Sequence, residues 1–226
     1  MSAFASTIKN QSVFLLCFVI YLLVGAYIIQ TIPFGELELK VNANHTPFLD
    51  LFFKYWTNLG DGWFYTFFAI GVLLWKYYYG ILTLIVIGLQ TAVVQYLKLS
   101  VFDDRLRPLE FFKDNTTIKL VEGVDMVHFN SFPSGHTSTA FAMATLCALI
   151  FAKEVVGFRP MIQFLLFVMA LFVGFSRIYL FQHFFIDTYF GTIIGTGLSL
   201  IIFSVAENSR MAASPLLQRS LIIRKK

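Results

Sequence analysis

Charged residues are scarce in this chain of 226 residues. They make up 13% of the sequence, about half of the roughly 25% that a soluble domain carries. Hydrophobic residues make up 58% and aromatic residues 18%, and the mean hydropathy is +0.73. This composition excludes a soluble globular domain and indicates an integral membrane protein.

Cysteine, repeats and linkers are also nearly absent. Cys17 and Cys147 both fall inside apolar runs, which favours small buried hydrophobes over a disulfide or a metal pair. We expect a single domain over residues 1–226, with a membrane core at about 12–206 and a basic cytoplasmic tail at 207–226. The net charge of +4 is modest and its basic residues gather only in the tail, so no nucleic-acid partner is expected.

The apolar runs predict an all-α fold, an integral membrane bundle of six transmembrane helices. A span needs about 20 apolar residues, or fewer where Lys and Tyr side chains reach the interface. A cleaved signal peptide is the alternative for the first run, but that run is too long and no small-residue cleavage site closes it. The six predicted spans are 12–32, 63–75, 81–102, 136–151, 161–175 and 182–206.

Two further features concern the membrane surface. Asp50, Lys54 and Asn58 recur every four positions within an otherwise apolar stretch, which predicts an amphipathic interfacial helix after the first span. Basic residues, with little acid, occupy both termini and the turns at Lys76 and Lys153. Positive charge marks the cytoplasmic side. We therefore expect a multi-pass plasma (inner) membrane protein with cytoplasmic termini, whose other loops face the periplasm or the outside.

Charged and polar residues from four separate segments fall on that outer face. Each of these segments is suited to bind a phosphate group. Arginine binds phosphate oxygens with paired hydrogen bonds, and a helix that starts with glycine binds anions through its free backbone N–H groups. The predicted phosphate-binding residues are Lys98, Arg105, Arg107, Ser134, Gly135 and Arg177.

Two histidines divide the expected chemistry. His183 and Asp187 are four residues apart, so on one helix face the carboxylate can orient the imidazole for attack on phosphorus. His136 has no carboxylate four residues away and suits the general acid that protonates the leaving alcohol. The same three residues could be drawn as metal ligands, but the surrounding cations argue against a metal, and we expect neither metal nor cofactor.

These residues resemble the type 2 phosphatidic acid phosphatase superfamily of membrane lipid phosphatases. Its second motif, Pro-Ser-Gly-His, matches residues 133–136, and its third motif, Ser-Arg, five residues, His, three residues, Asp, matches residues 176–187. The first motif, Lys, six residues, Arg-Pro, departs, because eight residues separate Lys98 from Arg107. We assign Lys98 and Arg107 to that motif, with Arg105 as support.

The resemblance implies a metal-independent phosphatase that acts through a phosphohistidine on a lipid phosphate in the membrane. The substrate stays open among phosphatidate, phosphatidylglycerol phosphate, an isoprenoid diphosphate such as undecaprenyl diphosphate, and a phosphorylated glycolipid such as lipid A. The alternatives are a catalytically idle lipid-binding or transport protein, and a relative of the vanadate haloperoxidases. The complete set of histidines and aspartate argues against the first, and the six spans argue against the second.

Overall fold

The computed structural model describes residues 11–154 and 159–221, and none of these residues lies in a β-strand. The basic residues Lys9, Arg224, Lys225 and Lys226, on which part of the predicted orientation rests, lie outside the described ranges. The helical elements are α2 (Ser12–Thr31), α3 (Glu36–Ala43), α4 (Pro47–Trp56), the 3₁₀ turn η1 (Thr57–Gly60), α5 (Gly62–Trp75), α6 (Tyr77–Tyr96), the π-helical turn η2 (Leu97–Val101), α7 (Pro108–Phe111), α8 (Gly135–Glu154), α9 (Arg159–Tyr179), α10 (Phe185–Glu207) and α11 (Arg210–Ala213).

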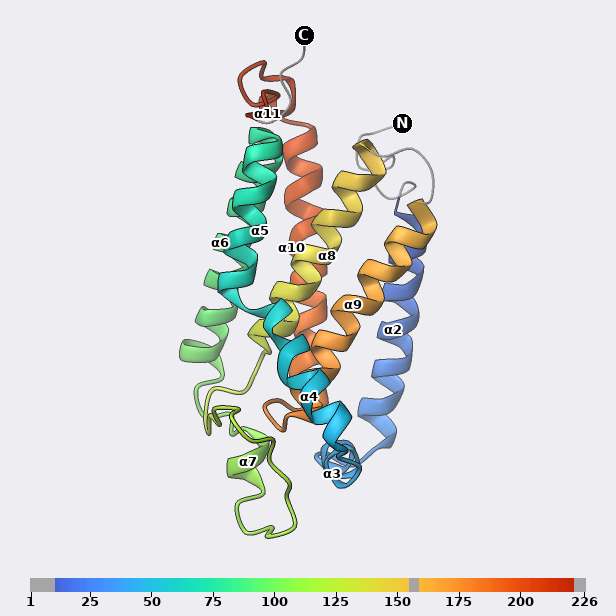
Figure 1. Cartoon of the computed structure of the whole chain (residues 1–226), viewed down its shortest axis with the longest axis vertical. Coiled ribbons are helices and arrows are strands. Elements are labelled where there is room, and N and C mark those ends of the chain that lie inside the picture. Colours follow the sequence, from blue (N-terminus) through green and yellow to red (C-terminus); the bar gives the residue numbers. More distant parts are fainter. Residues whose placement is uncertain (1–10, 155–158, 222–226) are drawn as a thin grey trace.

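Six long helices, α2, α5, α6, α8, α9 and α10, run along the long axis of the molecule (Figure 1). Four stretches are long and apolar enough to cross a membrane: Ser12–Thr31, Tyr77–Val101, Arg159–Tyr179 and Phe185–Glu207. The apolar helices Gly62–Trp75 and Gly135–Phe151 are shorter. α5 has 14 residues, or roughly 21 Å of helix, against a hydrocarbon core of about 30 Å. The chain is thus an all-helical membrane protein with four full-length candidate spans.

Two helix starts differ from the predicted boundaries. α6 begins at Tyr77 rather than Ile81, because Tyr78 and Tyr79 are buried in the bundle and the Tyr78 hydroxyl donates a hydrogen bond to Glu207 (2.9 Å). α10 begins at Phe185, so His183 precedes the helix instead of lying on it.

Helix α8 packs against both α9 and α10, and small residues allow the close approach. Ala140, Ala142 and Ala148 are buried, and Ser199 on α10 donates a hydrogen bond to the carbonyl oxygen of Ala142 (3.2 Å). A methyl group on Gly195 of α10 would overlap the carbonyl oxygen of Ser138. The small residues of these two helices are therefore a packing surface, as small residues commonly are between membrane helices.

The outer surface of the bundle is apolar. Leu23 of α2 and Phe67 of α5 are each 68% exposed, and Leu84 of α6 is 49% exposed. Soluble monomers rarely expose continuous apolar surface on this scale. The exposed surface is what a membrane protein presents to lipid tails.

The connections divide between the two ends of the bundle. The start of α2 and helix α11 lie at one end, and α3, α4, α7 and the long 102–134 connection lie at the other (Figure 1). At this second end α6 and α9 finish while α8 and α10 begin, so the polar segments singled out in the sequence meet there.

Helix α4, the predicted interfacial helix, is amphipathic and ends earlier than expected, at Trp56. Phe48, Leu51 and Tyr55 are exposed, while the Lys54 ammonium donates a hydrogen bond to the carbonyl oxygen of Glu122 in the long connection (2.6 Å). Lys54 thus faces the connecting loops and Phe48, Leu51 and Tyr55 face outward, while Phe53 is buried against Tyr179.

The contact between α8 and α10 gives a matched test of packing. Gly195→Ala should lower the melting temperature of the detergent-solubilised protein, because overpacking typically costs about 1–3 kcal/mol. Gly197→Ala, on the same helix with open space around its added methyl group, should leave it unchanged or raise it, because alanine is favoured over glycine in a helix by roughly 0.5–1 kcal/mol. Equal melting temperatures for the two variants would show that the α8–α10 approach is not close.

Candidate active site

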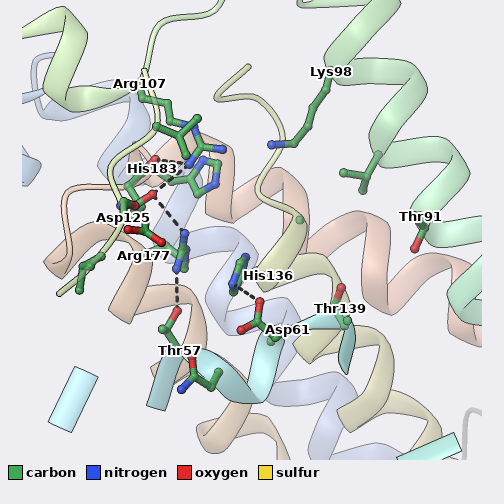
Figure 2. Close-up of a pocket in the computed structure, with 18 of the residues that line it drawn as sticks. Thr57, Asp61, Thr91, Lys98, Arg107, Asp125, His136, Thr139, Arg177 and His183 are labelled. Carbon is green, nitrogen blue, oxygen red and sulfur yellow. Dashed lines mark hydrogen bonds and ion pairs between the residues drawn. The ribbon is translucent and has the colours of Figure 1, made fainter. Parts of the chain in front are cut away.

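A cavity of about 640 Å³ opens among the polar segments at the second end of the bundle. Its walls come from η1, the start of α5, α6, η2, the start of α8, the end of α9 and the loop before α10. Of the predicted site residues it is lined by Lys98, Arg107, Gly135, His136, Arg177 and His183 (Figure 2).

Asp187 anchors the wall that carries His183. Its Oδ2 atom accepts hydrogen bonds from the Phe184 backbone N–H (2.9 Å) and the Ser131 hydroxyl (2.5 Å), and lies 3.3 Å from Nδ1 of His183. The pair meets because the carboxylate reaches back over the first turn of α10 to the preceding loop. The predicted contact between His183 and Asp187 is present, but the prediction that both residues lie on one helix face is wrong.

His183 is buried, at 1% exposure. Burial lowers the pKa of its imidazole well below the usual value, and the nearby cations, Arg107 first among them, act in the same direction. A neutral imidazole that donates from Nδ1 to Asp187 keeps Nε2 free of a proton. The environment therefore holds His183 in the form that a nucleophile requires.

His136 has a carboxylate partner that its sequence neighbourhood does not reveal. Its Nε2 atom lies 2.8 Å from Oδ1 of Asp61, the residue just before α5. The hydrogen bond from His136 lowers the pKa of Asp61, which remains ionised beside the imidazole. In the sequence, Gly60, Asp61 and Gly62 mark only a helix boundary, so no local signal connects Asp61 to His136.

Two arginines line the wall beside the histidines. Arg177 donates to the Thr57 hydroxyl (2.7 Å) and to Oε1 of Gln182 (3.4 Å). Arg107 donates to the same Oε1 atom (3.1 Å) and, from Nε, to the carbonyl oxygen of Phe129 (3.0 Å). Gln182, which the sequence analysis did not select, thus holds the two guanidinium groups side by side.

The cavity cations are buried without an acidic partner. Within the described residues neither arginine forms a salt bridge, Nε of Arg177 has no hydrogen-bond partner, and Lys98 donates only to the carbonyl oxygen of Asn130 (2.8 Å). Burial lowers the pKa of Arg107. Buried positive charge without a counter-ion is costly, and an anion in the cavity would offset that cost.

The start of α8 contributes differently from the prediction. Ser134 is fully buried: its backbone N–H donates to the carbonyl oxygen of Asp187 (3.0 Å), and its hydroxyl accepts from Thr137 (3.0 Å). Its side chain therefore holds the first turn of α8 and does not face the cavity. Gly135 and His136 are the first residues of α8, where backbone N–H groups lack partners within the helix.

Arg105 is not brought into the cavity. It is exposed, its guanidinium lies 6.0 Å from the ring centroid of Phe102, and it lines a separate, mostly apolar cavity of about 240 Å³. Lys98 and Arg107 do line the main cavity. The longer interval between them contains the π-helical turn η2, which includes Lys98, and a turn in which the Arg105 N–H donates to the carbonyl oxygen of Phe102 (3.3 Å).

The donor set does not resemble a metal site. Within residues 11–154 and 159–221, no three His, Cys, Asp or Glu side chains are placed to share an ion. His136 faces Asp61 (Figure 2), and His183 contacts Asp187 on the other side of its ring, so the two histidines do not share a carboxylate.

Comparisons with known proteins agree on the family. The family model described as the PAP2 superfamily matches residues 79–211. The crystal structure of Aquifex aeolicus LpxE is 29% identical, with a TM-score of 0.63, and the alignment covers 75% of this chain and 94% of that one. The crystal structure of a PAP2-type phosphatidylglycerolphosphate phosphatase from Bacillus subtilis is 24% identical, with a TM-score of 0.66, over 89% and 97% of the two chains. A search of curated protein sequences found no match. Since the family model covers more than half of the chain and includes both histidines, the protein belongs to the PAP2 superfamily.

Proposed function

We propose that the protein is a membrane lipid phosphatase that releases phosphate through a phosphohistidine formed on His183. The main support is the cavity itself, where two histidines, each with its own carboxylate, lie beside buried cations that form no ion pair with any described residue. PAP2 membership makes the protein a phosphoric monoester hydrolase, and the solved relatives include a lipid phosphatase. A lipid phosphate is therefore the substrate, with membrane lipids as its surroundings.

The first chemical step is attack on phosphorus by Nε2 of His183. Asp187 holds Nδ1–H and stabilises the positive charge that develops on the ring. Arg107, Arg177 and Lys98 stabilise the charge on the equatorial phosphate oxygens, assisted by the N–H groups of Gly135 and His136.

His136 acts as the general acid. It gives its proton to the departing alkoxide, and Asp61 holds the ring in place. In the second step His136 takes a proton from water, which attacks the phosphohistidine and restores His183. No metal or cofactor takes part in this scheme.

For the membrane arrangement, we extend the four full-length spans to six by including α5 and α8. Residues 1–226 then form one domain with a core at about 12–206 and a basic tail at 207–226. The termini are cytoplasmic in the plasma (inner) membrane, the cavity faces the periplasm or the outside, and α4 lies in the interface with Phe48 and Leu51 toward lipid. The grouping of the loops at the two ends of the bundle supports the six crossings (Figure 1), and the basic residues at Lys76 and Lys153 support the orientation.

Replacement of the nucleophile tests the reaction. His183→Ala should reduce phosphate release from lipid phosphates by about 10³-fold or more, as loss of a nucleophile typically does, while the protein still elutes as a folded species. His128→Ala, which changes an exposed loop histidine outside the cavity, is the matched control and should retain activity. Phosphate release from the unmodified enzyme should survive excess EDTA. Normal turnover by His183→Ala would remove the proposed nucleophile, and chelator sensitivity would restore a metal mechanism.

The irregular first motif has its own test. Lys98→Ala should lower kcat/KM by roughly 100- to 1,000-fold, because loss of one group that stabilises transition-state charge costs about 2.7–4 kcal/mol. Arg105→Ala should change it by less than about threefold, since Arg105 lies outside the cavity. Steady-state phosphate release with a single lipid phosphate distinguishes the two. The opposite order would place Arg105 at the phosphate.

The acid limb of the pH profile reports on His183. Its lowered pKa means that the imidazole stays neutral as the pH falls through 6.5, and that the nucleophile is lost only at lower pH. We expect kcat/KM, after correction for the second ionisation of the substrate phosphate near pH 6, to hold down to about pH 6 and fall below it. A corrected rate that already falls between pH 7.5 and 6.5 would contradict a neutral His183.

A further inference from the structure

The cavity has a second wall, made by helix α6, that differs chemically from the wall of cations. α6 is an apolar span, yet Gln90, Thr91 and Gln95 interrupt its apolar sequence and line the cavity together with Lys98. From Lys98 to Gln90 is two turns of helix, or about 12 Å along the axis. Polar side chains within a membrane span are costly and typically mark a substrate path.

Gln90 carries the clearest sign of a missing partner. It is 1% exposed, and its Oε1 atom has no hydrogen-bond partner within the described residues. A buried amide oxygen without a donor costs about 1–3 kcal/mol. A leucine of similar size would avoid that cost. A change of side-chain rotamer would turn the amide into the cavity that Gln90 lines, where a hydroxyl could donate to it.

The two walls are segregated by charge. The side that carries His183 presents Arg107 and Arg177. The side opposite presents Lys98 and, farther along α6 and on α8, neutral hydrogen-bonding groups, with Asp61 held by His136 between the two sides (Figure 2). The neutral groups are Gln90, Thr91, Gln95 and Thr139.

The direction of the reaction determines which part of the substrate meets this second wall. The entering and leaving groups lie roughly in line on opposite sides of phosphorus. With His183 on the cationic side and His136 as the acid, the leaving alcohol departs past His136 toward Thr139 and Thr91 (Figure 2). Gln90, Thr91 and Gln95 therefore face the leaving group, whereas Lys98 at the end of the same wall stays with the phosphate.

We propose that the α6 wall, Gln90, Thr91 and Gln95, is a binding site for a hydroxyl-bearing headgroup on the leaving-group side of the phosphate. This inference rests on the proposed phosphatase function and specifies its substrate class. Amides and a threonine hydroxyl both donate and accept hydrogen bonds, as glycerol and sugar hydroxyls require. The cavity volume of about 640 Å³ lies in the range of about 300–1,000 Å³ that holds drug-sized ligands, which leaves room for a headgroup beyond the phosphate.

The selected lipids carry the phosphate monoester on a glycerol or sugar headgroup. Lipids whose phosphate joins directly to the hydrophobic part, such as phosphatidate and isoprenoid phosphates, have no hydroxyl to place against α6. A site built to bind a hydroxyl discriminates strongly against the analogue that lacks it.

The test compares phosphatidylglycerol phosphate with phosphatidate of identical acyl chains, with His183→Ala as the blank. The enzyme should prefer the first lipid in kcat/KM. Gln90→Leu and Thr91→Val, both close in size to the residues they replace, should each lower kcat/KM for that lipid by about 10-fold, chiefly through KM, and change it less than about twofold for phosphatidate. Gln30→Leu, on the exposed surface of α2, is the matched control and should change neither value.

Each result bears on a different claim. A selective loss with phosphatidylglycerol phosphate supports the headgroup site. Equal losses with both lipids, or wild-type activity without preference, would overturn the headgroup site and leave the phosphatase function intact. Release from both lipids at the level of the His183→Ala blank would overturn the proposed function and the headgroup site with it.

Discussion

The Asp187 carboxylate is the junction on which the cavity depends. One of its oxygen atoms receives the Phe184 N–H at the start of α10 and the Ser131 hydroxyl just before α8, and it also contacts His183. Its backbone carbonyl receives the N–H of Ser134. The same residue therefore caps the start of α10, attaches the entry of α8 to it and orients His183. Because the close approach of α8 and α10 holds this junction in place, packing deep in the bundle and geometry at the phosphate are linked.

Buried positive charge is the second constraint. Arg107 and Arg177 share Oε1 of Gln182, and Lys98 donates to a backbone carbonyl, so the hydrogen bonds that these cations make within the described residues go to neutral acceptors, which do not neutralise their charge. A carboxylate at these positions would stabilise the empty cavity and would compete with phosphate. Neutral acceptors fix the geometry while leaving the charge available for an anion, an arrangement that favours electrostatic stabilisation of a phosphoryl transition state.

The sequence predicts the helical membrane fold and most of the cavity wall, because hydrophobic runs, charge asymmetry and two short motifs are local signals. His183 with Asp187 and the position of Arg177 belong to this part. Contacts between distant segments could not be predicted. Asp61 meets His136, Thr57 holds Arg177, and Gln182 joins two arginines only after the bundle forms. Two predictions from local patterns are wrong in detail. Asp187 caps α10 instead of sharing a helix face with His183, and the Ser134 side chain binds within the first turn of α8 instead of facing the cavity. The spacing around Arg105 was ambiguous because a π-helical turn changes which side chains face inward.

The short helix α5 connects the membrane architecture to the chemistry. It begins at Gly62, and α6 extends beyond that level toward the cavity end of the bundle (Figure 1). Gln90, Thr91 and Gln95 of α6 line the cavity there, and Asp61, the residue before α5, contacts His136. A longer α5 would span the membrane more easily, but it would fill the space beside α6 and move Asp61 away from His136. The position at which α5 begins thus explains both why this helix is short and why there is space beside α6.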